Sequence, residues 1–271
     1  MQQHIYIISE LGSNHDQDLR RALNLIYQAK QAGADAAKFQ FFRADSLVVS
    51  RGAPELWQAY KDHELPEEWL PILRNKCNEV GIDFLCTAYD EEGALKVEPY
   101  VRVHKVASFE AHSPAYVEWI GKRDRPVIIS TGMMGMDDVL RLVYTLPNLW
   151  AILHCTSAYP APYRDANLSA MAMVWEVVRE HGLETGARVG LSDHTPGISV
   201  PIAAAGLGAL CIEKHVTDDR TRSGPDHGIS IDFGRLTEMV SMIREVEEAL
   251  GDGVKRPTPS EEPMLRYRVT R

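Results

Sequence analysis

The stretch IYIISELGSNHDQDLRRALNLIYQAKQAGADAAKF (residues 5–39) decides the fold prediction. Its first run, Ile5–Ser9, is short and apolar, as expected of a strand that is buried on both faces. Leu19–Ala32 then repeats apolar residues at helical spacing and stops at Gly33, which suits a helix C-terminus. A second apolar run, Ala36–Phe39, follows. The stretch therefore predicts two parallel strands joined by a crossover helix.

The same alternation continues along the chain. Six further apolar runs predict strands at Asp83–Cys86, Arg102–Ala107, Val127–Ile129, Ala151–Leu153, Arg188–Leu191 and Leu210–Glu213. Helical patterns lie between or after them at Pro66–Val80, Glu91–Val97, Pro114–Gly121, Met136–Thr145, Leu168–Glu180, Ser199–Leu207 and Phe233–Leu250. Eight strands alternating with eight helices within about 250 residues predict an α/β fold, a single-domain (β/α)8 TIM barrel.

A doubly wound open sheet shares this alternation and is the rival prediction. Such a sheet would place Gly-x-Gly-x-x-Gly after its first strand, whereas this chain continues with Glu10-Leu-Gly-Ser-Asn-His15. We expect residues 1–250 to form the barrel and residues 251–271 a tail. The longest predicted loop, Phe42–Leu65, is long enough to act as a lid over one barrel mouth.

Composition excludes several functional classes. Of the 271 residues 45% are hydrophobic and 25% charged, as in an ordinary globular protein. The net charge of −9 and the lack of a basic run argue against a nucleic-acid partner. No signal peptide or membrane-spanning stretch is recognisable, so we expect no membrane partner and a cytoplasmic location. The four cysteines form no Cys-x-x-Cys pair, which predicts reduced thiols.

Polar residues follow all eight predicted strands. In a TIM barrel the active site is built at these C-terminal strand ends. Any strand end that meets water can be polar, but ionisable groups converging from most strands favour a site. The strand ends contain Ser9-Glu10, Lys38-Phe-Gln40, Cys86-Thr87, His104-Lys105 with Ser108-Phe-Glu110, Ser130-Thr-Gly132, His154-Cys-Thr-Ser157, Ser192-Asp-His194 and Glu213-Lys-His215.

His194 and His215 are the best candidate metal ligands, because they close neighbouring strands. Two imidazoles completed by water or a carboxylate suit Mn²⁺, Co²⁺ or Zn²⁺. Glu213 or Asp193 could orient one of the rings. The alternative is a pair of ordinary hydrogen-bonded histidines. Among the other histidines, three compete as ligands (His15, His154, His227), and two are expected at the surface (His4, His63).

Lys38 and Lys105 predict a pocket for a small anion, with Ser108 and Ser130 close by. Lysine supplies a point charge for phosphate. A Schiff-base lysine is the other reading, because barrel aldolases use one. Glu10 and Glu110 are the candidate proton-transfer carboxylates.

Eight motifs, in order over about residues 5–260, resemble the sialic acid synthase family, which includes N-acetylneuraminate, pseudaminate and legionaminate synthases. The resemblance implies a TIM barrel with a divalent metal, Mn²⁺ first and Mg²⁺, Co²⁺ or Zn²⁺ next. It implies condensation of phosphoenolpyruvate with an N-acylated amino sugar, giving a nine-carbon 2-keto acid and phosphate. The motifs are Ser9–His15, Gly33–Gln40, Lys105–Ser108, Ile128–Met133, Leu153–Pro162, Gly190–Thr195, Ile212–His215 and Gly224–Asp226.

The resemblance also implies roles for single positions. His194 and His215 match the metal ligands, and Glu10 and Glu110 match acidic residues near the reacting carbons. Lys105 joins these carboxylates as a catalytic candidate. Substrate-binding candidates are Lys38, Thr87, Lys105, Ser108 and Ser130 for phosphoenolpyruvate, Gln40, Tyr159 and Asp226 for the sugar side, and Ser157 at a strand end.

The chain departs from the family pattern at three places. Typical members continue into an antifreeze-like domain that swaps across a dimer, whereas this sequence ends at Arg271. The resemblance implies a homo-oligomer. We expect the contribution of that domain to come from another residue or a separate protein, or the substrate to differ. Cys86-Thr-Ala-Tyr89 replaces the usual Ser-Thr-Pro-Phe, and Phe109 replaces a common glycine. Two other functions remain open, a Schiff-base aldolase using Lys38, Lys105 or Lys214, and a binding protein for a sugar acid or phosphoenolpyruvate.

Overall fold

Parallel strands form a closed barrel in the computed structural model, which describes residues 4–47, 54–181 and 186–269. Neighbouring strands pair in chain order, and β1 also pairs with β8. This closing pairing, with Glu10 opposite His215, confirms the TIM barrel and shows that the open sheet was wrong. The strands are β1 Tyr6–Gly12, β2 Ala36–Phe41, β3 Asp83–Ala88, β4 His104–Val106, β5 Val127–Ser130, β6 Leu149–Cys155, β7 Arg188–Asp193, β8 Cys211–Thr217 and the short β9 Ile231–Asp232, which pairs with β8.

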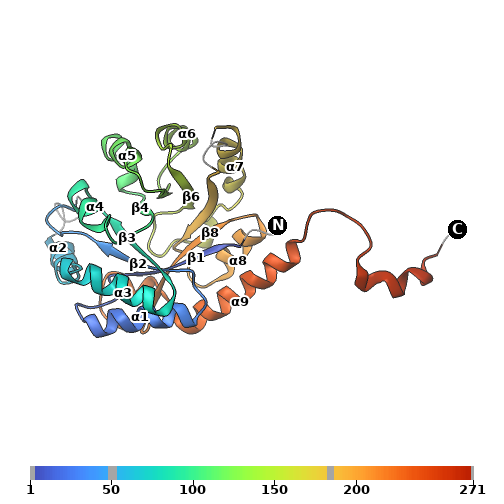
Figure 1. The fold of residues 1–271 in the computed structure, drawn as a ribbon, viewed down its shortest axis with the longest axis horizontal. Coiled ribbons are helices and arrows are strands. Elements are labelled where there is room, and N and C mark those ends of the chain that lie inside the picture. Colours follow the sequence, from blue (N-terminus) through green and yellow to red (C-terminus); the bar gives the residue numbers. More distant parts are fainter. Residues whose placement is uncertain (1–3, 48–53, 182–185, 270–271) are drawn as a thin grey trace.

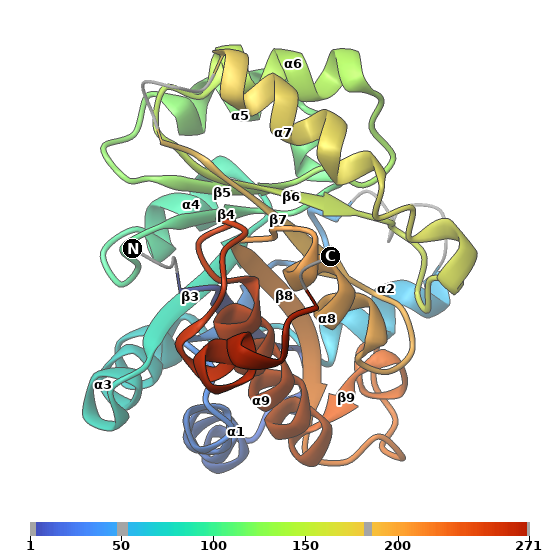
Figure 2. The same ribbon diagram turned by 90° about the vertical axis from the view of Figure 1, so that its right-hand side faces the viewer.

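Helices surround the strands on the outside (Figures 1 and 2). Side-chain caps start several of them; Asp18, for example, accepts the backbone amides of Arg20 and Arg21 at the start of α1. The helices are α1 Leu19–Gln31, α2 Pro54–Lys61, α3 Leu70–Val80, α4 Glu91–Val97, α5 Pro114–Gly121, α6 Met136–Thr145, α7 Ala170–His181, α8 Ser199–Gly206 and α9 Phe233–Leu250, with 3₁₀ turns η2 Glu67–Trp69, η3 Glu110–His112, η4 Tyr163–Asp165, η5 His227–Ile229 and η6 Pro259–Tyr267.

The segment predicted as one long loop, Phe42–Leu65, contains α2. Trp57 and Tyr60 lie three residues apart on this helix; the indole of Trp57 donates to Asp45, and the Tyr60 ring packs edge-on against Phe42. Both partners precede the helix within the same segment, so the helix depends on these contacts and not on apolar spacing among its own eight residues. Residues 48–53 of the predicted lid lie outside the described residues.

Two apolar layers hold the fold together, one on each face of the strands. The outer layer packs strand residues such as Phe39 and Ile212 against the helices. The inner layer fills the barrel, so polar residues further along the strands stand on an apolar floor. The floor consists of Ile8, Ala36, Leu85, Ile128, Ala151, Leu153 and Cys211.

Beyond α9 the chain runs away from the barrel (Figure 1). Residues 251–269 are exposed along almost their whole length, and η6 keeps Leu265 half-buried. The division into a barrel and a tail stays a prediction. Across the described ranges, we found no helix whose length and apolar character would let it span a bilayer.

Candidate active site

A pocket opens above the apolar floor, at the C-terminal ends of the strands. Most of the predicted site residues line it. Side chains two residues apart along a strand point to the same face, so the inward residues beyond the floor reach the pocket. The lining residues are Glu10, Lys38, Gln40, Thr87, Tyr89, Lys105, Ala107, Ser108, Ser130, Tyr159, Ser192, His194, Glu213 and His215.

Two buried lysines form the base of the pocket. Lys38 Nζ lies 2.5 Å from Glu10 Oε2 and donates to Thr87 Oγ1 at 2.9 Å. Lys105 Nζ donates to Ser130 Oγ at 2.8 Å. Glu213 stands between the lysines, 3.6 Å from the amine of Lys38 and 3.8 Å from that of Lys105. Lysines and carboxylates of four different strands therefore form one charged cluster.

Burial and the attraction of the lysines give the two carboxylates of this cluster very different pKa values. Burial raises the pKa of Glu10 to about 7, although Lys38 opposes this. Burial also acts to raise the pKa of Glu213, but Lys105 and Lys38 lower it to about 2. Burial acts to lower the pKa of Lys38, but Glu10 and Glu213 raise it; burial lowers the pKa of Lys105. The cluster gains positive charge whenever Glu10 is protonated, which favours an anion in the pocket.

His194 and His215 face each other across the pocket, with ring centroids 5.5 Å apart. His194 Nδ1 lies 2.9 Å from the Thr156 carbonyl, so Nδ1 donates there and leaves Nε2 with a lone pair. Burial lowers the pKa of His215 to about 4, which keeps this ring neutral. Burial also acts to lower the pKa of His194, but Cys155 raises it above its ordinary value.

These imidazoles fit an open divalent-metal site. His215 Nδ1 is buried and has no hydrogen-bond partner among the described residues; the carboxylate of Asp226 is 3.9 Å away. In the described ranges no group of three or more His, Cys, Asp or Glu side chains is arranged to hold a metal. Two imidazoles would therefore leave the remaining coordination positions to water or substrate oxygens, the arrangement of a reactive site.

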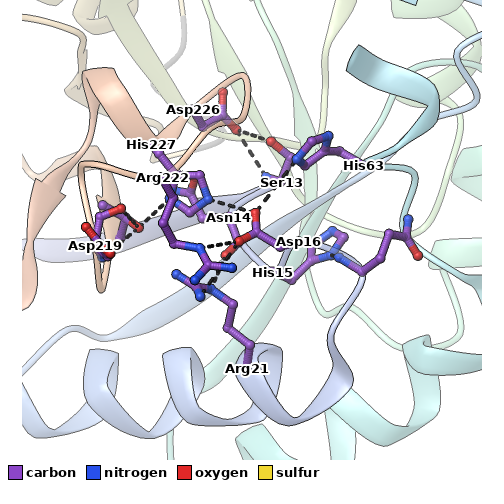
Figure 3. A network of polar contacts seen from close by, with 12 residues as sticks. Ser13, Asn14, His15, Asp16, Arg21, His63, Asp219, Arg222, Asp226 and His227 are labelled. Atoms are coloured by element: carbon purple, nitrogen blue, oxygen red, sulfur yellow. Dashed lines mark hydrogen bonds and ion pairs between the residues drawn. The ribbon is translucent and has the colours of Figure 1, made fainter. Parts of the chain in front are cut away.

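Asp226 reaches this centre from the loop after β8. It accepts hydrogen bonds from the amide and hydroxyl of Ser13, at 3.1 and 3.0 Å, on the loop after β1 (Figure 3). Gln40 Nε2 donates to Glu10 Oε1 at 2.8 Å and lies 3.5 Å from Asp226. Gly12 has a φ of +50°, and a Cβ there would lie 2.3 Å from Asp226 Oδ2. Only glycine lets the two loops approach this closely.

Hydroxyl groups surround the backbone of Gly132 at the opposite side of the pocket. The Gly132 amide donates to Ser108 Oγ at 3.0 Å. A Cβ on Gly132 would lie 2.0 Å from Ser157 Oγ, so this hydroxyl is also adjacent, and it has no partner among the described residues. The Tyr159 ring lies 4.3 Å from that of His194 and is half-exposed, forming a wall of the mouth.

Glu110 stands apart from the residues that line the pocket. It begins η3, and its Oε2 is buried without a hydrogen-bond partner in the described part of the chain. Burial raises its pKa to about 7. A carboxyl group in this state can exchange a proton near neutral pH.

The competing histidines do not join the pair. His154 points out of the barrel to the Ala166 carbonyl at 2.8 Å. His227 bridges Thr217 at 2.7 Å and Asp16 at 2.8 Å (Figure 3), and the ring of His15 packs against Trp69. His4 is exposed as predicted. His63 is not a surface residue, because its ring is half-buried near Asp16.

Two residues considered for the site, Asp193 and Lys214, lie on the outer strand face and do not line the pocket. Asp193 bonds to Lys214 at 2.6 Å and to Thr195, with no direct hydrogen bond to an imidazole among the described contacts. Ser192, predicted to lie at a strand end, and Tyr89 also line the pocket, although neither was assigned a role from the sequence. Ser192 donates to Glu213 at 3.1 Å, and Tyr89 donates to Gln40 Oε1 at 3.0 Å. Each lies two residues from a predicted site residue, a spacing that could have identified them.

Comparisons with known proteins agree over most of the chain. Residues 25–255 match the family model described as the NeuB family. An N,N'-diacetyllegionaminic acid synthase of Legionella pneumophila is 39% identical over 280 residues, which cover 96% of this chain and 77% of the relative. The human N-acetylneuraminate-9-phosphate synthase is 35% identical over 271 residues, or 94% of this chain and 74% of the relative.

A solved structure shows the same architecture. The sialic acid synthetase of Leptospira borgpetersenii, solved in complex with citrate, superposes with a TM-score of 0.89 at 30% identity. The match covers 98% of this chain and 92% of that one.

Proposed function

The chain belongs to the NeuB family, whose similar members are named as synthases of nonulosonic acids, and we propose that it condenses phosphoenolpyruvate with an N-acylated amino sugar. A bond would form between carbon 3 of phosphoenolpyruvate and the aldehyde carbon of the sugar. Water would add at carbon 2 and release a proton, the aldehyde oxygen would take up a proton, and phosphate would leave with the oxygen of carbon 2. The product is a 2-keto acid.

One observation carries this proposal: Lys38 and Lys105 converge in a buried pocket beside a pair of imidazoles. An anion with both a carboxylate and a phosphate needs two positive charges and several hydroxyl donors. The lysines provide the charges, and Ser108, Ser130 and Thr87 provide the hydroxyls. Because the lysines lie on the apolar floor, water screens them little and their attraction for the anion is strong.

His194 and His215 would hold a divalent cation, with Mn²⁺ as the first candidate. When bound, such an ion supplies Lewis-acid polarisation of a carbonyl oxygen. The chain's own residues then handle orientation and protons. Gln40 and Asp226 would contact the sugar, and Tyr159 would border it. Glu10, with its pKa near 7, accepts the proton of the incoming water and is ready to return it.

A product assay tests the proposal. The purified protein is incubated with phosphoenolpyruvate, Mn²⁺ and a panel of singly and doubly N-acetylated amino sugars. We expect phosphate release together with a product whose mass equals sugar plus phosphoenolpyruvate plus water minus phosphate. Lys105→Met should abolish both signals, whereas Lys96→Met, on the surface of α4, should leave them intact.

The other outcomes identify the alternatives. A stable adduct on Lys105 after borohydride treatment with a keto acid would contradict the proposal in favour of a Schiff-base aldolase, because only an imine is trapped. Saturable phosphoenolpyruvate binding without turnover on any sugar would instead support a binding protein.

A further inference from the structure

The outer face of β7 and β8 carries a buried ion pair directly behind the two histidines. Asp193 and Lys214 are partners in the strand register, and each immediately precedes one of the histidines in sequence. Because successive residues of a strand point to opposite faces, this pair lies outside the barrel wall while Ser192 and Glu213 point inside.

The pair is tied to the chain on both sides of His194. Lys214 Nζ lies 2.6 Å from Asp193 Oδ2 and also donates to the Thr195 carbonyl. Asp193 in turn accepts from the Thr195 amide at 3.0 Å and from its hydroxyl at 3.1 Å. Asp193, Thr195 and Lys214 are each at most 3% exposed. The residues before and after His194 are thus both bound to the residue before His215.

His194 needs such an anchor more than His215 does. His215 lies within β8 and is opposite Glu10 in the pairing with β1. His194 follows the last residue of β7, in a stretch without regular structure that continues until α8 begins at Ser199. The ring of His194 bonds to the Thr156 carbonyl, its backbone carbonyl accepts from the Ala161 amide at 2.9 Å, and the residues on both sides of it are held by Lys214.

Stability does not explain this arrangement by itself. Removing two charges from water costs free energy, and apolar residues of similar volume are often as stable or more stable at such a site. Both residues are at most 3% exposed, so the pair is removed from water. The geometric effect of the pair, a fixed distance between neighbouring strand ends, is what an apolar replacement cannot reproduce.

We propose that Asp193 and Lys214 are positioning residues that set the separation and orientation of His194 and His215 for a divalent cation. This inference rests on the proposed role of the histidines. It assigns no contact with substrate to the pair. Loss of the pair should loosen the ligand geometry and weaken metal binding by about 10- to 100-fold, as loss of other residues that support a metal ligand does.

Metal titration of the chelator-treated protein, without substrates, tests the proposal. Mn²⁺ binding is followed by electron paramagnetic resonance and Co²⁺ binding by visible absorption. Asp193→Asn/Lys214→Met removes both charges and keeps an acceptor for the Thr195 amide. We expect it to remain folded, to bind Mn²⁺ about 10- to 100-fold more weakly, and to show an altered Co²⁺ spectrum. Ile212→Val, on the same face of β8, is the control and should bind as the wild type does.

Each result decides a separate point. If the wild type binds neither ion, both the metal part of the proposed function and this inference fail. If the wild type binds and the folded double variant binds equally well, only this inference fails. Should the double variant not fold, the milder Asp193→Asn takes its place: a weaker Mn²⁺ affinity supports the inference, and an unchanged one overturns it.

Discussion

The inner and outer faces of β7 and β8 both bury polar residues, but those residues differ in whether their polar atoms already have partners. On the inner face, Ser192, Glu213 and His215 line the pocket, and His215 Nδ1 has no partner in the described part of the protein. On the outer face, Asp193 and Lys214 bind each other and Thr195. A buried polar residue is therefore a candidate for binding when it keeps an unpartnered atom, and for positioning when the protein uses its donors and acceptors.

The buried lysines show the same contrast. Lys38 and Lys105 are inside the barrel and line the pocket; Lys38 pairs with Glu10, and the two amines lie 3.6 and 3.8 Å from Glu213. Lys214 is outside and is fully paired with Asp193. The presence of a lysine near a strand end therefore does not by itself predict that its amine faces the pocket.

The largest effect is expected from replacing a histidine of the inner face. His194→Ala or His215→Ala should abolish Mn²⁺ binding and reduce kcat/KM by more than ~100-fold, because a ligand matters more than the partners that support it. Isothermal titration with Mn²⁺ and the product assay measure the two effects together.

His154→Ala is the matched control, because this histidine ends a strand too but bonds outside the barrel to the Ala166 carbonyl. It should keep wild-type Mn²⁺ affinity. Full metal occupancy in both pocket variants, or loss of it in the control, would reject the distinction between the faces.

A smaller effect concerns Glu110, whose buried carboxylate should lower the free energy of unfolding at high pH. Burial raises the pKa of Glu110 to about 7 from its ordinary value of 4.5. The folded state therefore binds the proton more tightly than the unfolded state, and stability falls as pH rises through this window. Glu110→Gln mimics the protonated form. The variant should gain on the wild type by at most ~3 kcal/mol above pH 8 and by little at pH 4.

Urea unfolding at several pH values between 4 and about 9 measures this difference. A gap between Glu110→Gln and wild type that stays constant with pH, or that narrows as pH rises, would show that the carboxyl group is not destabilised by burial. Activity is not the readout here, because Glu110 is itself a catalytic candidate.

The smallest expected effect lies on the outer face. Ile212→Val removes one buried methylene between β8 and the helices and should cost about 1 kcal/mol of unfolding free energy. Because Ile212 does not line the pocket, kcat/KM should equal that of the wild type. A change in kcat/KM larger than twofold would mean that packing on this face reaches the pocket.

Local pattern was sufficient for most of the fold. The ranges Glu91–Val97, Pro114–Gly121, Met136–Thr145 and Phe233–Leu250 were predicted with the bounds observed. Each carries its own signals in apolar spacing and capping residues, so it needs no distant partner to be recognised. The helix α2 was not predicted, because it is held by contacts of Trp57 with Asp45 and of Tyr60 with Phe42, and not by a clear apolar repeat of its own.

Much of the candidate site also followed from position at strand ends. Lys38, Lys105, His194 and His215 line one pocket as expected. The orientation of Lys214 could not be predicted in this way. Side chains alternate between the two faces of a strand, so an error of one residue in assigning the inward positions exchanges the two faces. The contact of Asp226 with Ser13 could not be predicted either, because their positions are 213 residues apart in the chain.

The sequence by itself determined the order of strands and helices, the family, and the set of polar residues at the strand ends. These depend on short-range spacing, which any stretch of chain contains. Only the tertiary structure decided which of those residues face one another, which atoms keep a free lone pair, and which charges are already neutralised. Those properties arise when the barrel closes and brings β1 beside β8, because closure fixes the inward face of every strand at once and removes water from it.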